Sequence, residues 1–150
     1  MKTILFTVLL IGLLPCGKAQ YQQHMNTQEE VTAITAVLQQ YYFKGLYEGD
    51  TSLLARAFLP GTQLFGDVNR QPYAKTLDQY LDGVAHRASP KAAGKTFEPE
   101  IIAIDVINSI AIAKLHVKMY DFNYYNFLTF HKVNDKWLIV HKTLTHVAES

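Results

Sequence analysis

The sequence predicts an α+β fold in which helices pack on one face of an antiparallel sheet. Residues 95–147 read as four consecutive strands, because their runs of β-branched and aromatic residues mostly alternate. The turn signals between these runs lie at 108–109, 121–123 and 134–135. Strands joined by such short turns form an antiparallel meander. Three helical patterns and one short strand precede it, so the expected order is helix, helix, strand, helix and four strands.

The first helix is predicted to begin at a capping box, with Thr27 as the N-cap residue and Glu30 as its N3 partner. Apolar residues then recur at helical spacing, and the helix is expected to end at Glu48, before Gly49. The other elements expected before the meander are a helix over 51–59 capped by Asp50, a strand over 62–68, a turn over 69–72, a helix from a second capping box at 76–79 to about 87, and a loop over 88–94.

Residues 1–19 have the pattern of a secretory signal peptide. A short positive start is followed by an apolar run, Ile4–Leu14, that is too short to span a bilayer. Gly17 and Ala19 are small residues at the positions that precede a cleavage site before Gln20. We therefore expect an exported chain, periplasmic or secreted, whose mature form begins at Gln20.

Cys16, the only cysteine, leaves a second interpretation open. A lipoprotein signal would lipidate this residue and hold the chain on a membrane, although Pro15 is unfavourable immediately before such a cleavage site. Cleavage after Ala19 instead removes the cysteine, so that no disulfide and no membrane anchor remain. Residues 20–26 are then expected to form a flexible lead-in, and residues 27–148 a single domain.

The composition is that of one globular domain, with 49% hydrophobic and 18% charged residues among 150. A net charge of +1 excludes the basic surface that nucleic-acid binding requires. The chain carries no glycine-rich phosphate loop, catalytic-triad order or metal motif, so we expect no metal and no cofactor. His141 and His146, an odd number of residues apart in one strand, point to opposite faces and cannot share an ion.

The turns also predict the strand register. Two-residue turns at 108–109 and 134–135 predict which residues face each other across the strands. The predicted pairs are Val106 with Ala111, Ile104 with Ala113, Ile102 with Leu115, Glu100 with Val117, Val133 with Lys136, Phe130 with Ile139, Leu128 with His141, and Asn126 with Thr143. The inward face of this register is apolar except for Glu100, Asn126, His141 and Thr143. A buried polar group is costly unless it is paired, so these residues either pair within the core or line a cavity that admits a ligand. The other residues expected at such a cavity are Met119, Trp137, Tyr42, Tyr80 and Asp67.

The opposite face of the sheet also carries many apolar residues, among them Ile112, Phe127 and Val140. A sheet face in contact with water is normally more polar than this. An apolar patch of this kind is typical of a partner surface, so we expect a homodimer through the outer face of the sheet.

Residues 127–142 run from Phe127 through a hairpin into Trp137-Leu-Ile-Val-His-Lys142. This segment resembles the "putative lumazine-binding" branch of the NTF2-like, SnoaL-like superfamily, and residues 42–65 are also similar. Asn134-Asp135 stands where that branch usually has Asp-Gly. The resemblance covers about residues 27–147 and implies a cone of helices on a curved sheet, a pocket inside the cone, and often a dimer through the outer sheet face. It implies no single activity and transfers no catalytic residue.

Three functions fit these observations. We favour a non-catalytic module whose cone binds a small, flat, apolar or aromatic molecule. The second is an isomerase, cyclase or dehydratase in which His141, with Glu100 or Asp67, moves protons next to a carbonyl. The third is a structural or interaction protein whose own side chains fill the pocket.

Overall fold

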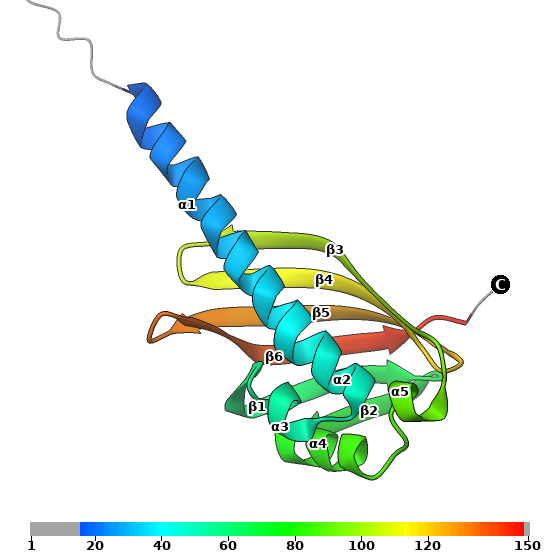
Figure 1. Cartoon of the computed structure of the whole chain (residues 1–150). Helices are drawn as coiled ribbons and strands as arrows, with labels where there is room; N and C mark the ends of the chain where they lie inside the picture. Colours follow the sequence, from blue (N-terminus) through cyan, green and yellow to red (C-terminus); the bar gives the residue numbers. More distant parts are fainter. Residues whose placement is uncertain (1–15, 149–150) are drawn as a thin grey trace, which may run out of the picture.

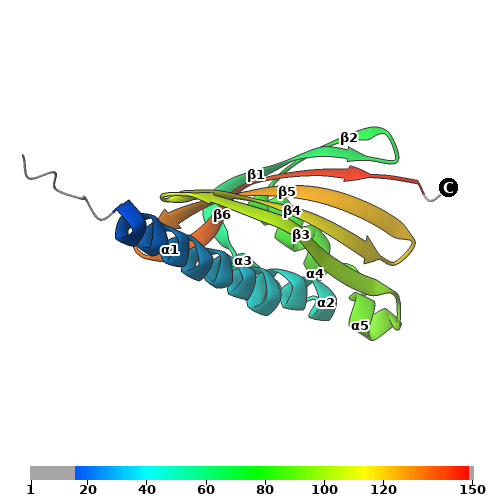
Figure 2. The ribbon, with the colours of Figure 1, turned by 90° about the horizontal axis from the view of Figure 1, so that it is seen from above.

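A long helix crosses one face of a curved sheet, and shorter helices cover the end of that face (Figure 1). The structure, a computed structural model, describes the backbone of residues 16–148 and the side chains of residues 27–148. Seen from above, the helices all lie on the same side of the sheet (Figure 2). The predicted α+β class is therefore confirmed.

The helical elements are α1 (Cys16–Val37), a π-helical segment η1 (Leu38–Phe43), α2 (Lys44–Glu48), α3 (Thr51–Ala55), α4 (Leu77–Ala85) and α5 (Pro90–Ala93). The strands are β1 (Phe58–Val68), β2 (Gln71–Thr76), β3 (Phe97–Ile107), β4 (Ile110–Met119), β5 (Phe122–Val133) and β6 (Lys136–His146). The strand order is β2-β1-β6-β5-β4-β3. Only the β1–β6 pair in this sheet is parallel. The predicted meander, β3 to β6, is confirmed, and the β1–β2 hairpin extends it beyond β6.

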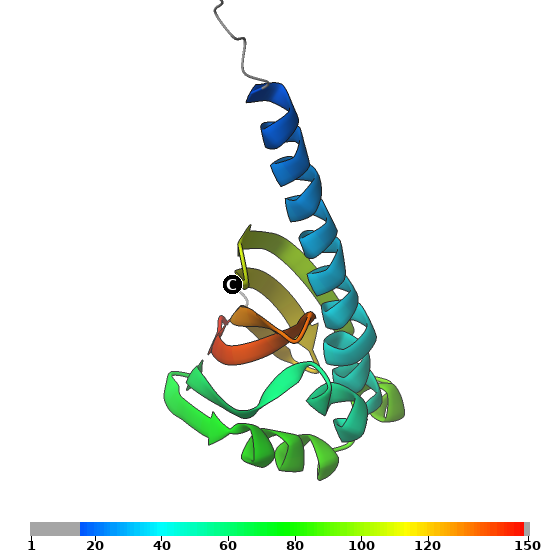
Figure 3. The ribbon, with the colours of Figure 1, turned by 90° about the vertical axis from the view of Figure 1, so that its left-hand side faces the viewer.

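The sheet curls from β3 to β2 (Figure 3). α1 and α2 run along the concave side of the sheet. α4 contacts β1 and β2 and lies across the edge of the sheet that these two strands form. Among residues 16–148, no helix is both long enough and apolar enough to cross a membrane.

The long helix α1 begins before the predicted capping box. Thr27 and Glu30 lie inside the helix, so Thr27 is not its N-cap, and residues 20–26, predicted as a flexible lead-in, are helical. A capping box satisfies the free N–H groups at a helix start, and it has nothing to cap where the preceding turn is already helical. The predicted signal peptide falls mostly on residues 1–15, outside the described residues, so export stays a prediction.

Three other local predictions are confirmed. Gly49 ends α2 with a φ of 72°, and the Asp50 side chain caps α3 by accepting from the Leu53 N–H over 2.8 Å. The capping box at the start of α4 is complete, because Thr76 and Gln79 each accept a hydrogen bond from the other's backbone N–H.

The sequence did not reveal β2. The predicted turn over 69–72 is confined to Asn69 and Arg70, which have positive φ, and the strand after it pairs with β1. β1 also begins early, at Phe58, so α3 ends at Ala55 rather than at Leu59. Parallel pairing with β6 competes here with the local helical pattern, and tertiary pairing prevails.

A β-bulge interrupts β6. Phe130 pairs with Ile139 as predicted, but the next pair is Thr129 with His141, so Val140 has no partner on β5. One extra residue shifts the alternation of every later side chain by one position. The buried Thr62 hydroxyl lies 3.0 Å from the Ile139 carbonyl oxygen and helps to satisfy the backbone beside the bulge.

After Val140, the bulge exchanges the residues of β6 that face the helices with those that face outward. The predicted pairs Leu128–His141 and Asn126–Thr143 are wrong, and the observed pairs are Leu128–Lys142 and Asn126–Leu144. Lys142 is consequently buried, with 5% exposure. His141 lies on the outer face, where its ring stacks on that of Phe65.

A second bulge, at Ile102, interrupts β3. The observed pairs around it are Ile101–Leu115, Ala103–Lys114 and Glu100–His116, in place of the predicted Ile102–Leu115 and Glu100–Val117. The carboxylate of Glu100 is therefore exposed on the outer face, 3.5 Å from His116 Nδ1.

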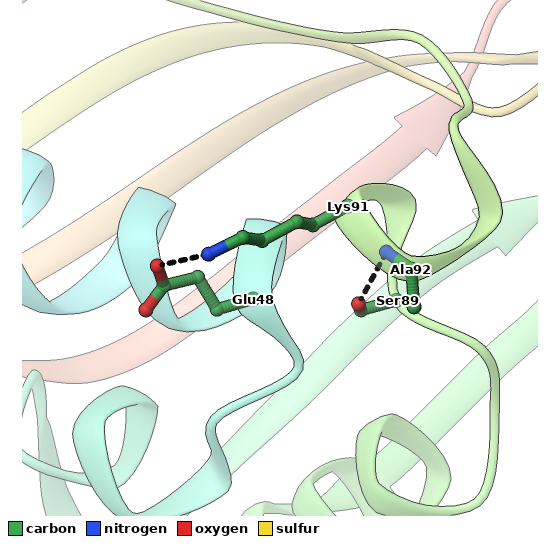
Figure 4. Close-up of polar contacts among 4 residues, drawn as sticks. All are labelled: Glu48, Ser89, Lys91 and Ala92. Carbon is green, nitrogen blue, oxygen red and sulfur yellow. Dashed lines mark hydrogen bonds and ion pairs between the residues drawn. The ribbon is translucent and has the colours of Figure 1, made fainter.

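The predicted loop over 88–94 contains the short helix α5 (Figure 4). Ser89 Oγ accepts from the Ala92 N–H over 3.1 Å and caps this helix, while Lys91 Nζ lies 3.0 Å from Glu48 Oε1 of α2. A Cβ on Gly49 would lie 2.9 Å from Ser89 Cβ, so α2 and α5 approach closely only because glycine stands there.

Candidate ligand pocket

A cavity of about 150 Å³ lies between the helices and the inner face of the sheet. We call it the Lys142 cavity. Its apolar lining residues are Leu46, Val68, Gly83, Val84, Val117, Met119 and Leu144, and its polar lining residues are Tyr42, Tyr73, Lys75, Tyr80, Arg87, Tyr124, Asn126 and Lys142. A dry cavity of about 150 Å³ can hold a molecule the size of benzene.

The amine of Lys142 is held in place by two tyrosines. Nζ donates to the Tyr42 hydroxyl over 2.7 Å and lies 3.4 Å from the Tyr80 hydroxyl. The ring centroids of Tyr42 and Tyr80 are 5.2 and 4.8 Å from Nζ. Tyr42 belongs to η1, and π-helical turns of this kind often occur at functional sites.

Burial, and to a lesser extent the positive charge of Arg87, lowers the pKa of Lys142 from 10.5 to about 7. No carboxylate side chain from the described residues lines the cavity, so no negative charge there offsets the effect of burial. Burial also raises the pKa of Tyr42 and of Tyr80, which keeps both hydroxyls protonated at neutral pH. The cavity thus contains a lysine that gains or loses a proton near pH 7.

Asn126 projects into the same cavity from β5. The residue is only 3% exposed, and its side-chain amide has no hydrogen bond to any side chain or backbone group of the described residues. Among those residues no fully buried side-chain nitrogen or oxygen lacks a partner, so the Asn126 amide is open to the cavity and not sealed in the core. The Asn126 amide is therefore positioned to bond a molecule inside the cavity.

The profile of one protein family, described as "Putative lumazine-binding", matches residues 29–145. The chain belongs to this family. The predicted family resemblance is confirmed. Among curated proteins, none matches this chain.

Solved structures similar to this chain include three NTF2-like proteins of unknown function. The protein from Shewanella baltica OS155 is 24% identical, with 81% of this chain and 96% of that chain covered and a TM-score of 0.71. The proteins from Silicibacter pomeroyi DSS-3 and Methylobacillus flagellatus KT are each 21% identical with TM-scores of 0.72, and each match covers 80% of this chain and 98% or 94% of the other. These similarities confirm the NTF2-like fold.

Four of the predicted pocket residues line the Lys142 cavity. They are Tyr42, Tyr80, Met119 and Asn126, and they come from four different elements. The turn register placed Met119 and Asn126 correctly, because the extra residues lie on β3 and β6 and leave the alternation along β4 and β5 unbroken.

Five predicted pocket residues lie elsewhere. His141 and Thr143 are on the outer face because of the Val140 bulge, and Glu100 is there because of the Ile102 bulge. Asp67 accepts a hydrogen bond from the Thr145 hydroxyl over 3.1 Å, away from the cavity. Trp137 is buried under α1, where Nε1 donates to Glu30 Oε2 over 2.6 Å.

Sequence reasoning missed Lys142, the most unusual member of the site. Strict alternation from the 134–135 turn assigns it to the outer face, and no glycine near Val140 marks the bulge. Tyr73 and Lys75 were missed because no strand was predicted over residues 71–76, and both line the cavity from β2. Of these missed features, only β2 had a signal in the sequence, because Tyr73 and Lys75 alternate there with smaller or polar residues.

Proposed function

We propose that this chain is an exported protein that binds a small, flat, largely apolar molecule in the Lys142 cavity and does not transform it. The observation that carries this is the Asn126 amide, which has no hydrogen-bonding partner among the described residues and opens into the Lys142 cavity. A ligand that reaches this amide would recover the missing hydrogen bond.

The lining supports a flat ligand. Aromatic rings of Tyr42, Tyr80 and Tyr124 and apolar side chains such as Val84 and Val117 surround the space. The family description points to lumazine, a fused two-ring heterocycle. Because about 150 Å³ suits one ring, a two-ring ligand would extend beyond the cavity, and the exposed Arg87 and the half-buried Lys75 are lining residues that it could reach there.

The predicted enzymatic alternative, which uses His141 with a carboxylate, finds neither group at the cavity within residues 27–148. Its proposed acid–base residue, His141, stacks on Phe65 on the outer face, and no carboxylate from the described residues lines the cavity. Acid–base catalysis needs such groups within hydrogen-bonding reach of the substrate. The unfilled volume likewise disfavours a purely structural role for the cone.

The outer face supports the proposed homodimer. Ile112 and Phe127 are 42% and 46% exposed near the middle of the sheet, and Val140 lies on the neighbouring strand. A second copy of the same face would bury this apolar patch about a two-fold axis. Export is supported by the apolar run Ile4–Leu14 and the small residues before Gln20.

Gly83→Leu tests the binding function. Gly83 lines the cavity from α4, and an added Cβ would meet only Lys75 Nζ, at 3.7 Å, so a side chain can be added there and leucine is expected to occupy part of the cavity. Native mass spectrometry of protein purified from the producing cell should show a bound small molecule, and Gly83→Leu should lose it. Ala85→Leu, on the exposed side of the same helix, should retain it. Equal retention by both variants would place the ligand outside this cavity and refute the proposal.

A further inference from the structure

We propose that the ligand is a planar organic monoanion, whose charged group lies between the Lys142 amine and the Asn126 amide. This inference rests on the proposed function and specifies the chemistry of the molecule that the cavity takes. A carboxylate is the simplest such head group.

The charges around the cavity favour an anion. Three cationic residues, Lys142, Lys75 and Arg87, line it, and among the described residues no Asp or Glu does. A protonated amine that is 5% exposed is costly without a counter-charge, and the two tyrosine hydroxyls that Nζ contacts are neutral. A bound anion would supply the counter-charge that the chain does not.

The hydrogen-bond donors converge on one place. Lys142 and Asn126 are diagonal neighbours on the inner face, because Asn126 pairs with Leu144, two residues after Lys142. An ammonium group has three N–H bonds, and Tyr42 and Tyr80 account for two of them. The third N–H and the Asn126 amide remain to bind the two oxygens of a carboxylate, with its apolar body against Val84 and Val117.

Anion binding should therefore be coupled to proton uptake. The hydroxyls of Tyr42 and Tyr80 contact the Lys142 amine directly. The other titratable or charged groups that line the cavity are Tyr73 and Lys75 on β2, Tyr124 on β5 and Arg87 after α4. Burial lowers the pKa of Lys142 to about 7, whereas an adjacent anion favours the charged amine. Affinity for an anion should be highest below pH 7 and should fall as the pH rises through that value.

The test uses benzoate and its neutral isostere benzamide, which match the size of the cavity. Carboxylic acids titrate near pH 4, so benzoate is an anion throughout pH 6–9. Isothermal titration calorimetry at pH 6.5 should show benzoate binding roughly tenfold or more tightly than benzamide, the worth of one charge-assisted hydrogen bond. In Tris and imidazole buffers at pH 7, the two apparent enthalpies should differ by an amount that corresponds to uptake of about half a proton.

Two variants assign the effect to residues. Lys142→Met should abolish both the preference for benzoate and the proton uptake, while Asn126→Leu should weaken benzoate roughly tenfold and keep the proton uptake. Lys114→Met, on the exposed outer face, should change neither. Equal affinities for benzoate and benzamide in the wild type, or a preference that survives Lys142→Met, would overturn this inference but leave the proposed function standing. Binding of neither compound, together with no effect of Gly83→Leu on a co-purified ligand, would overturn both.

Discussion

Trp137 Nε1 in β6 donates a hydrogen bond to Glu30 Oε2 in α1 over 2.6 Å. The other carboxylate oxygen of Glu30 lies 2.6 Å from Lys132 Nζ in β5. One carboxylate thus joins the long helix to both strands of the β5–β6 hairpin. Hydrogen bonds from Lys132 and Trp137 lower the pKa of Glu30, as expected for a carboxylate stabilised in its charged form.

Glu30→Gln should therefore destabilise the protein at neutral pH. A carboxyl group with a lowered pKa in the folded state contributes stability above its ordinary pKa, and that contribution is lost as the pH falls through the folded value. Urea unfolding should show a lower midpoint for the variant at pH 7 and a smaller difference from the wild type at pH 3.5. Glu29→Gln, on the exposed side of α1, is the matched control and should unfold like the wild type. If Glu30→Gln lowers the urea midpoint equally at pH 7 and at pH 3.5, the negative charge of Glu30 does not contribute to stability.

Lys142→Met should stabilise the ligand-free protein. The unfolded chain binds a proton at this lysine up to about pH 10.5, whereas the folded protein releases it near pH 7. Wild-type stability should therefore rise between pH 7 and 9, by up to about 1.4 kcal/mol per pH unit from this group. Methionine should raise stability most at pH 6–7 and remove this slope, and Lys114→Met should leave the slope intact. A lower melting temperature for Lys142→Met at pH 6 would show that the amine makes a net favourable contribution.

Thr62→Val probes the hydrogen bonding beside the β6 bulge. Thr62 is 4% exposed, and its hydroxyl lies near the carbonyl oxygens of Leu59 and Ile139. Valine has nearly the same shape but no donor, so it should lower the free energy of unfolding by about 1–3 kcal/mol. The comparison is Thr143→Val on the outer face, where the hydroxyl makes only a long contact of 3.4 Å with the Phe127 carbonyl. Chemical denaturation of both variants measures the difference, and equal stabilities would show that the Thr62 hydroxyl contributes little.

Phe127→Lys and Val140→Lys should each convert a homodimer into a monomer, because each places a charge in the apolar outer face. Light scattering coupled to gel filtration at micromolar concentration reports the mass directly. Ala85→Lys on α4, on the helical side of the molecule, should remain dimeric. A monomeric wild type would refute the proposed dimer.

The exported protein should begin at Gln20. N-terminal sequencing or intact mass of protein recovered from the producing cell checks this cleavage, which follows from the small residues Gly17 and Ala19. A lipidated Cys16 at the N-terminus would instead identify a membrane-anchored form.

Much of the fold follows from local patterns, and the site follows only in part. Turn residues, the caps at Asp50 and Thr76, and alternation along β4 and β5 predict the elements correctly, because each depends on neighbouring residues. The inward placement of Lys142 depends on one extra residue in β6, which nothing in its immediate sequence marks. The contacts of Glu30 join residues more than 100 positions apart, and no single-chain pattern predicts them.

The extra residue at Val140 also affects how related chains should be compared. A relative that lacks one residue at this point would regain unbroken alternation, and the residue after Ile139 would face outward as His141 does. The position equivalent to Lys142 would still face the cavity, although it would lie one step closer to the 134–135 turn. Residues of this cavity should therefore be matched by counting back from the C-terminal end of the last strand. Counting forward from the hairpin turn would align an inward side chain of one protein with an outward side chain of another.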